Sequence, residues 1–207
     1  TACWCLQDAF GKEATDIALE LLDGVDKNAV AMIFKMIENN VNLVESSSMG
    51  RFFDAAASLA GICKINTYEG QAPMEMESMI AGSKLPDGLY KCEIKEKDGM
   101  IEIDTRPVIR SIVHDRKNGE KVSKIASKFH NAVADSILEI SRKLRSRAGL
   151  ESVAVSGGVF QNRVLTERTM EILGKDGFRV LRQKKVPPND GGISFGQVAI
   201  AACRSKG

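Results

Sequence analysis

The sequence predicts an α/β fold class, in which a helical first part precedes a lobe with a mixed β-sheet. After Gly149, β-branched runs alternate with amphipathic segments, an order typical of parallel strands with helices on the sheet faces. Residues 89–95 and 100–104 alternate apolar and polar side chains around Lys97–Asp98–Gly99, which predicts a β-hairpin. We expect this hairpin to add antiparallel strands to the same sheet.

The first part, residues 1–85, is expected to be mostly helical. Ile33, Met36 and Ile37 share one helical face, and that helix is expected to end at Asn39–Asn40. A second helix is predicted from about Arg51 to Gly61, where apolar residues recur every three or four positions and Gly61 suits the stop. The segment MEMESMIAG predicts a further short helix. We place the start of the second domain, residues 86–207, near Leu85.

In the second domain, apolar residues step by threes and fours from Val122 to Leu144 and predict a long helix. Three arginines and a lysine lie near the C-terminal end of this helix, where the macrodipole favours positive charge. This effect explains their position better than a nucleic-acid-binding patch does. His130 lies on this helix and is expected to have a structural role. The later elements are expected in this order: strand Ser152–Val155, helix from about Gln161 to Leu173, strand Phe178–Leu181, and helix Ile193–Cys203.

Composition excludes several classes of protein. The net charge of +2 over 207 residues gives no bulk attraction to nucleic acid, and no apolar run reaches the roughly 18 residues that span a bilayer. The five cysteines are scattered without a CxxC pair, which favours a reducing, cytoplasmic location. Thr1 is not an initiator methionine and no signal-peptide pattern follows it, so we expect a processed chain or a piece of a longer protein.

The turn VSGGVFQN, between a strand and a helix, is a candidate anion site. Gly157 and Gly158 let a ligand approach the backbone, and unpaired N–H groups at a helix start favour phosphate. Asn162 is placed to bond a ligand from the first turn. The lysine of a P-loop is absent. A plain turn that starts a helix stays an open alternative.

The segment VPPNDGGISFGQ gives a second candidate site. Asp190 is expected beside the SGG turn, because both follow parallel strands of one sheet. A carboxylate next to a phosphate usually needs a metal or a hydroxyl between them. Alternatively, Asn189 or Asp190 simply caps the next helix.

A third candidate lies in the helical part. Gly50 opens a helix in SSSMGRFFD, Asp54 lies one turn further on, and Glu75 follows the small-residue loop around Gly70. Carboxylates of this kind hold ribose hydroxyls. A solvated helix face is the plainer interpretation of Asp54 and Glu75, and an anion or a surface contact are both open for Arg51.

Four stretches together resemble one family: SSSMGRFFDAAASLAGI, TYEGQAPMEME, VSGGVFQNRVL and VPPNDGGISFGQ. They occur in the order seen in the C-terminal, Kae1-like part of HypF, the hydrogenase maturation carbamoyltransferases. The resemblance runs from about residue 45 to the end. It implies the actin/Hsp70/sugar-kinase (ribonuclease H-like) fold, in which two lobes clasp a nucleotide.

The resemblance also implies an activity. The family uses ATP and carbamoyl phosphate to make a carbamoyl-adenylate, and transfers the carbamoyl group to the C-terminal cysteine of HypE, for the cyanide ligands of [NiFe]-hydrogenase. By motif, Gly157, Gly158 and Asn162 resemble the nucleotide loop. Asp190 resembles a ligand of a divalent metal, iron or zinc. The set Gly50, Asp54 and Glu75 resembles positions that face adenosine and its ribose.

The family's HxxxH metal pair and first lobe are absent from these residues. We therefore expect the separate chain to be inactive, and to form a homodimer through the apolar face that the first lobe would cover. No residue resembles a covalent nucleophile. Three alternatives stay open: a tRNA threonylcarbamoyl transferase, whose loop tends to read SGGVAAN, an antibiotic O-carbamoyltransferase, and a catalytically silent nucleotide- or partner-binding half-domain.

Overall fold

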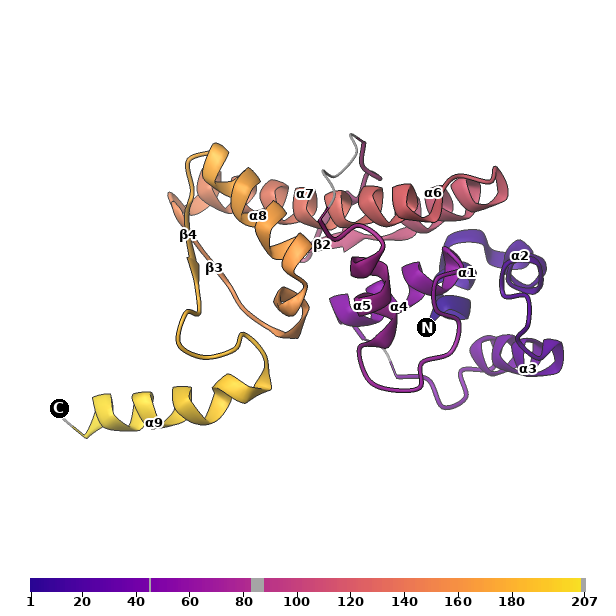
Figure 1. The fold of residues 1–207 in the computed structure, drawn as a ribbon, viewed down its shortest axis with the longest axis horizontal. Coiled ribbons are helices and arrows are strands. Elements are labelled where there is room, and N and C mark those ends of the chain that lie inside the picture. The colour runs from indigo at the N-terminus through magenta and orange to yellow at the C-terminus, as the bar shows by residue number, and fades with distance from the viewer. Residues whose placement is uncertain (45, 83–87, 206–207) are drawn as a thin grey trace. The chain divides into compact units, whose positions relative to one another are not determined.

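The computed structural model describes residues 1–44, 46–82 and 88–205, and it divides into two compact units (Figure 1). The first unit is Thr1–Ser136 and the second is Ile137–Gly207. The domain boundary predicted near Leu85 lies outside the described residues, so it stays a prediction. The long helix α7 (Val122–Ala148) contributes residues to both units.

The first unit is mainly helical, as expected. Its other elements are α1 (Ala2–Phe10), the 3₁₀ turn η1 (Gly11–Glu13), α2 (Ala14–Leu21), α3 (Lys27–Glu38), α4 (Met49–Leu59), α5 (Gln71–Ser78), β1 (Glu93–Lys97), β2 (Met100–Asp104) and α6 (Arg106–Lys117). The second unit adds β3 (Ser152–Val155), η2 (Gly158–Gln161), α8 (Arg163–Lys175), β4 (Arg179–Arg182), η3 (Asp190–Gly192) and α9 (Ile193–Arg204).

Helix α4 begins and ends as its sequence indicates. The Ser48 hydroxyl accepts a hydrogen bond from the Arg51 amide at 3.5 Å, which caps the start of the helix. At the other end, Gly61 has a φ of 79°, and the next amide, that of Ile62, donates to the Ala57 carbonyl. This pattern is a Schellman stop, and it confirms the predicted end at Gly61.

The predicted apolar face of α3 is partly wrong. The helix ends at Glu38 with Asn39 as its cap, as expected, but its buried residues are Val30 and Phe34. Ile33 is 42% exposed. The face that packs is therefore turned by about one residue from the predicted one, because Phe34 supplies the larger apolar side chain.

The core of the first unit gathers around the first half of α7. The Phe129 ring lies 5.0 Å from that of Phe52 and 4.8 Å from that of Phe53, in tilted and edge-on arrangements that aromatic rings favour. His130 is fully buried, and its Nδ1 lies 2.8 Å from the Ala126 carbonyl. The predicted structural role of His130 is confirmed.

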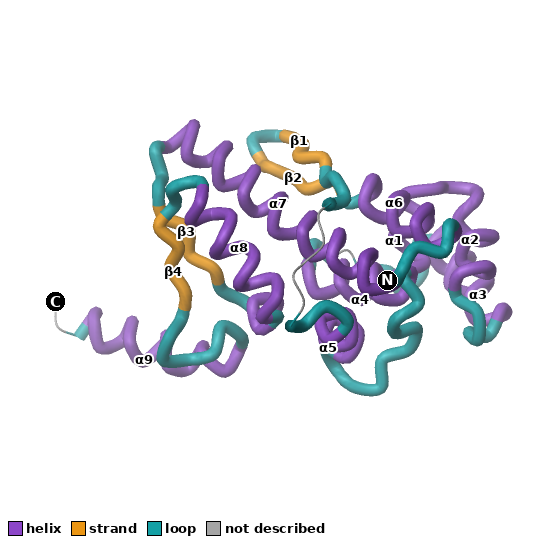
Figure 2. Tube along the Cα trace, turned by 45° about the horizontal axis from the view of Figure 1, so that its top comes forward, coloured by secondary structure: helices purple, strands orange, loops and turns teal. Residues whose placement is uncertain are grey.

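The predicted single mixed sheet is wrong for the described residues, where the four strands form two separate pairs (Figure 2). Strands β1 and β2 make the predicted antiparallel hairpin, with Ile94 opposite Ile103. Strands β3 and β4 pair in parallel, with Val155 opposite Arg182. Alternation predicts each strand locally, but strand order depends on contacts between distant segments, which alternation does not encode.

The second unit has a small core of its own. Leu138, Leu173 and Phe178 are buried together, and partly buried residues of β3 and β4 pack against them. Arg145 stacks over the Phe178 ring at 4.1 Å and, with Arg142, pairs with Asp176. These contacts use the basic residues at the end of α7, so their charge has a structural explanation.

No helix among the described residues is long and apolar enough to cross a bilayer.

Candidate nucleotide-binding site

The parallel pair β3–β4 brings the SGG turn beside the PPNDGG loop. The Gly157 amide donates a hydrogen bond to the Pro188 carbonyl at 2.8 Å, and the Gln183 side chain donates to the Ser156 hydroxyl at 2.7 Å. Both loops follow the carboxyl ends of their strands, where ligands bind in open α/β sheets. The expected neighbourhood of the SGG turn and the loop that holds Asp190 is therefore observed.

The helix after β3 starts two residues later than its expected start near Gln161. Gly158 begins the short 3₁₀ turn η2, and α8 starts only at Arg163. Asn162 is the reason for the delay, because its backbone is extended and its Oδ1 accepts from the Leu165 amide at 2.8 Å. Asn162 is thus the N-cap of α8, a structural role that its predicted ligand contact did not include.

The two glycines of this turn are not equivalent. Gly157 has a φ of 101°, which disfavours any side chain, and its amide is already bonded to Pro188. An added Cβ at Gly158 would meet no atom within 4 Å. The space beside Gly157 is equally open, so the two positions differ in backbone conformation: Gly157 is needed for the turn itself, whereas Gly158 can accept a side chain.

In the second loop, Asn189 caps η3 by accepting from the Gly191 amide at 3.1 Å. A Cβ at Gly192 would lie 2.8 Å from the Pro187 carbonyl oxygen, so this close approach requires glycine. The cap is Asn189, one of the two residues expected for it, and Asp190 is the exposed first residue of η3.

A second group of predicted residues lies on α4 and α5 of the first unit. Gly50 is in the first turn of α4. Asp54 receives hydrogen bonds from the Arg51 guanidinium at 3.1 Å and from the Asn66 amide at 3.4 Å. Arg51 thus orients the carboxylate of Asp54 from one side and Asn66 from the other.

Glu75 belongs to a chain of polar contacts on α5. Its Oε1 accepts from the Gln71 amide at 2.8 Å, and Gln71 in turn accepts from the Thr67 amide at 2.7 Å. The buried Cys63 belongs to the group around Asp54, because its thiol lies 3.3 Å from Oδ1 of Asn66, whose side chain donates to Asp54. Burial raises the pKa of the Cys63 thiol, and the charges of Glu75 and Asp54 raise it further.

The structure therefore forms two groups from the predicted site residues. Gly157, Gly158 and Asn162 lie in the second unit beside the loop that holds Asp190, whereas Gly50, Asp54 and Glu75 lie in the first unit. Sequence reasoning missed Asn66, Gln71 and Cys63. Their signal was present in the polar segment CKINTYEGQ, which separates the two carboxylates.

A family model described as the second subdomain of the Kae1-like domain of carbamoyltransferases (HypF) matches residues 1–197. The chain belongs to the HypF carbamoyltransferase family. This match confirms the resemblance to HypF. It also favours HypF over the two other families considered, the tRNA-modifying and the antibiotic-modifying carbamoyltransferases.

Individual HypF proteins agree. The carbamoyltransferase HypF of Synechocystis sp. is 38% identical over 153 residues, which is 74% of this chain and 19% of the relative. The probable carbamoyltransferase HypF of Methanocaldococcus jannaschii is 31% identical over 192 residues, which is 93% of this chain and 24% of the relative. A crystal structure of full-length HypF in a phosphate- and nucleotide-bound form superposes with a TM-score of 0.85 at 39% identity.

The last comparison covers 98% of this chain and 31% of the solved HypF chain. The chain therefore spans between about a fifth and a third of the length of these relatives. Its helices and small sheets match the corresponding part of the HypF structure.

Proposed function

We propose that this chain is part of a carbamoyltransferase domain that binds an adenine nucleotide, as ATP or as a carbamoyl-adenylate. The observation that carries the proposal is the hydrogen bond from the Gly157 amide to the Pro188 carbonyl, which holds two glycine-rich loops side by side. The solved HypF relative was crystallised with phosphate and nucleotide, which supports a ligand of this class. The actin/Hsp70/sugar-kinase character of the fold is part of the same proposal.

Gly158 is the residue we assign to close contact with the nucleotide in the second unit. Its position is free of neighbouring atoms, so the backbone can approach a phosphate or a ribose there. Gly157 and Asn162 support this contact by fixing the turn and by capping α8.

Asp54 and Glu75 are the residues we assign to hydroxyl groups of the ribose, with Gly50 leaving room beside them. Arg51, Asn66 and Gln71 already donate to these carboxylates and hold them in place. A carboxylate fixed in this way accepts hydrogen bonds from hydroxyls without losing further side-chain freedom.

Asp190 is the residue we assign to a divalent metal, iron or zinc. The described residues contain no group of three His, Cys, Asp or Glu side chains that suits a metal ion. Asp190 by itself supplies one ligand and does not make a site, so this assignment requires further ligands from beyond the described residues.

The carbamoyl acceptor in this proposal is a thiol of a partner, the C-terminal cysteine of HypE, whose carbamoyl group then becomes a cyanide ligand of [NiFe]-hydrogenase. The chain's own buried cysteines are poor acceptors. Burial raises the pKa of Cys3 and of Cys63, which keeps these thiols protonated, and the thiolate is the nucleophilic form.

Nucleotide titration by calorimetry tests the proposal on the longer protein that contains this segment. Gly158→Val adds a side chain into open space, so we expect the fold to persist. The affinity for ATP or ADP should fall about tenfold or more, because the valine side chain would occupy space that the nucleotide needs. Asp54→Asn is expected to weaken binding by a similar factor through lost charge-assisted hydrogen bonds to the ribose.

Gly174→Val is the matched control, since Gly174 is exposed on α8 and its added Cβ also meets no atom within 4 Å. It should leave the affinity unchanged. If Gly158→Val and Asp54→Asn bind nucleotide as tightly as the control, the assignment of these residues is wrong.

A further inference from the structure

A pocket of about 460 Å³ lies in the first unit between α6 and residues 88–90, and α7 closes one side. Its lining includes Tyr90, Arg110, His114, Asp115 and Lys128. None of these residues belongs to the nucleotide-binding assignment. The volume falls within the range of pockets that hold small organic molecules.

One wall of the pocket is held firmly in place. The Gly88 carbonyl accepts from the Asn131 side chain at 2.9 Å, and the Tyr90 amide donates to the Lys128 carbonyl at 3.4 Å. The Tyr90 hydroxyl donates to Asp115 Oδ2 at 2.7 Å, and Tyr90 is only 5% exposed. The pocket is therefore formed before any ligand enters it.

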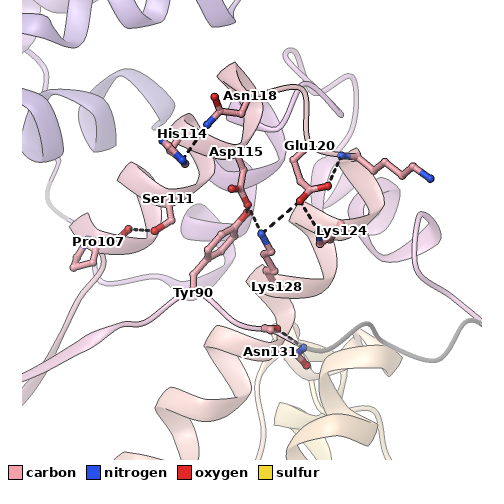
Figure 3. A network of polar contacts seen from close by, with 12 residues as sticks. Tyr90, Pro107, Ser111, His114, Asp115, Asn118, Glu120, Lys124, Lys128 and Asn131 are labelled. Atoms are coloured by element: carbon pink, nitrogen blue, oxygen red, sulfur yellow. Dashed lines mark hydrogen bonds and ion pairs between the residues drawn. The ribbon is translucent and has the colours of Figure 1, made fainter.

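The carboxylate of Asp115 is already neutralised. Lys128 Nζ lies 2.6 Å from the same oxygen that Tyr90 contacts, and these three side chains converge in Figure 3. Burial by itself would raise the pKa of Asp115, but the hydrogen bonds from Lys128 and Tyr90 outweigh it and lower that pKa. Lys128 Nζ also lies 3.8 Å from Glu120, which pairs with Lys124 at 2.7 Å. Two carboxylates and two ammonium groups therefore balance one another in this wall, and it does not repel an anion strongly.

Arg110 brings a positive charge to this pocket, and no carboxylate among the described residues forms an ion pair with it. Its Nε donates to the Ala9 carbonyl at 2.9 Å, which anchors the guanidinium. In the described part of the chain, the two terminal nitrogens of Arg110 have no acceptor and make no ion pair. A guanidinium with a fixed plane and two free N–H groups presents the fork that binds an oxyanion through two hydrogen bonds.

His114 adds a second donor one helical turn after Arg110, on the same face of α6. The Asn118 side-chain amide donates to His114 Nε2 at 2.9 Å, so the neutral ring carries its proton on Nδ1. Figure 3 shows His114 on α6 and Asn118 just after the end of the helix. His114 is also one of the residues that line the pocket, so its ring is within reach of a ligand there.

We propose that this pocket binds a small organic anion, whose phosphate or carboxylate group is held by Arg110 and His114 and whose body rests against Tyr90. The guanidinium of Arg110 supplies the charge, the ion pair of Asp115 and Lys128 supports the wall, and the pocket volume suits a small molecule.

An NMR titration of the 207-residue chain tests the proposal, with sodium phosphate and sodium acetate as separate probes at constant ionic strength. The Arg110 Nε–H signal and the Tyr90 amide should shift saturably with at least one probe, and the tighter probe identifies the group that is bound. Arg110→Gln should weaken binding about tenfold or more, because it removes a charge-assisted bidentate contact.

Lys35→Gln is the matched control, because it removes one positive charge from an exposed position on α3 of the same unit. It should leave the affinity unchanged. If Arg110→Gln unfolds the chain, His114→Ala on the surface carries the test, with an expected weakening of about threefold. Absence of saturable binding with both probes, or equal weakening by Arg110→Gln and Lys35→Gln, would overturn the proposal.

Discussion

Burial sets the pKa of two residues of the first unit, His130 and Cys63. His130 lies fully buried against Phe53, with ring centroids 5.2 Å apart, and burial lowers its pKa to about 4. Burial shifts the pKa of Cys63 in the opposite direction: it raises this pKa, because it disfavours the charged thiolate. For these two residues the pKa follows from how deeply the side chain is packed.

We expect His130 to make the fold sensitive to mild acid. The unfolded chain takes up the proton near pH 6.5 and the folded chain only near pH 4, so the unfolded state binds more protons between these values. The free energy of unfolding should therefore fall by about 2 kcal/mol between pH 7 and pH 5.

Urea unfolding at several pH values measures this effect. His130→Gln has no titrating ring, so its stability should be lower at pH 7 but should fall less with pH than that of the parent chain. The two pH profiles would have equal slopes if His130 did not contribute.

At the scale of elements, helix ends decide where the chain changes direction. Gly61 closes α4 with a positive φ, and Asn162 delays the start of α8 until Arg163. The Gly61 stop was predictable from glycine at the end of an apolar stripe. The delay at Asn162 was not, because an asparagine after two glycines suits both a ligand contact and a cap.

Two glycine substitutions should change stability in opposite directions. Gly61→Ala places a side chain at a φ of 79° and should cost about 1–2 kcal/mol of unfolding free energy. The added Cβ also approaches the end of the Arg116 side chain, which can move aside. Gly174→Ala in α8 meets no atom and should stabilise by about 0.5–1 kcal/mol.

Thermal unfolding of both variants checks this pair of expectations. If Gly174→Ala lowered the free energy of unfolding, the expected gain from the backbone of α8 would be contradicted. A neutral Gly61→Ala would show that the turn after α4 tolerates a side chain.

At the scale of the whole molecule, the two compact units differ in how much they bury. The first unit has a large apolar core that includes Leu6, Phe53 and Phe129. The second unit has a small cluster around Phe178, and none of the residues of α9 is buried. Local stability follows the buried apolar contacts, so it should be uneven along the chain.

We expect the amides of α9 to exchange with solvent much faster than those in the first half of α7. Ile193, Phe195 and Val198 are each more than half exposed, so little packing free energy opposes the opening of the helix. Hydrogen exchange with mass spectrometry measures both segments in one experiment. Equal protection of α9 and of residues 122–136 would contradict the expectation.

Local elements could be predicted from the sequence more completely than the contacts between distant segments. The long helix α7 and the hairpin of β1 and β2 followed from periodicity, and the adjacency of the two glycine loops followed from the logic of parallel strands. The single mixed sheet did not form, since no local pattern records which strands pair. The anion pocket was also out of reach, because residues 88–90, Arg110 and Lys128 meet only after folding.

The bond between the Gly157 amide and the Pro188 carbonyl has one more consequence. It couples the two loops mechanically, so a displacement of one loop stretches a contact made by the other. The exchange rate of the Gly157 amide hydrogen therefore reports on both loops. A ligand that holds either loop in place should slow this exchange, and separation of the two loops should speed it.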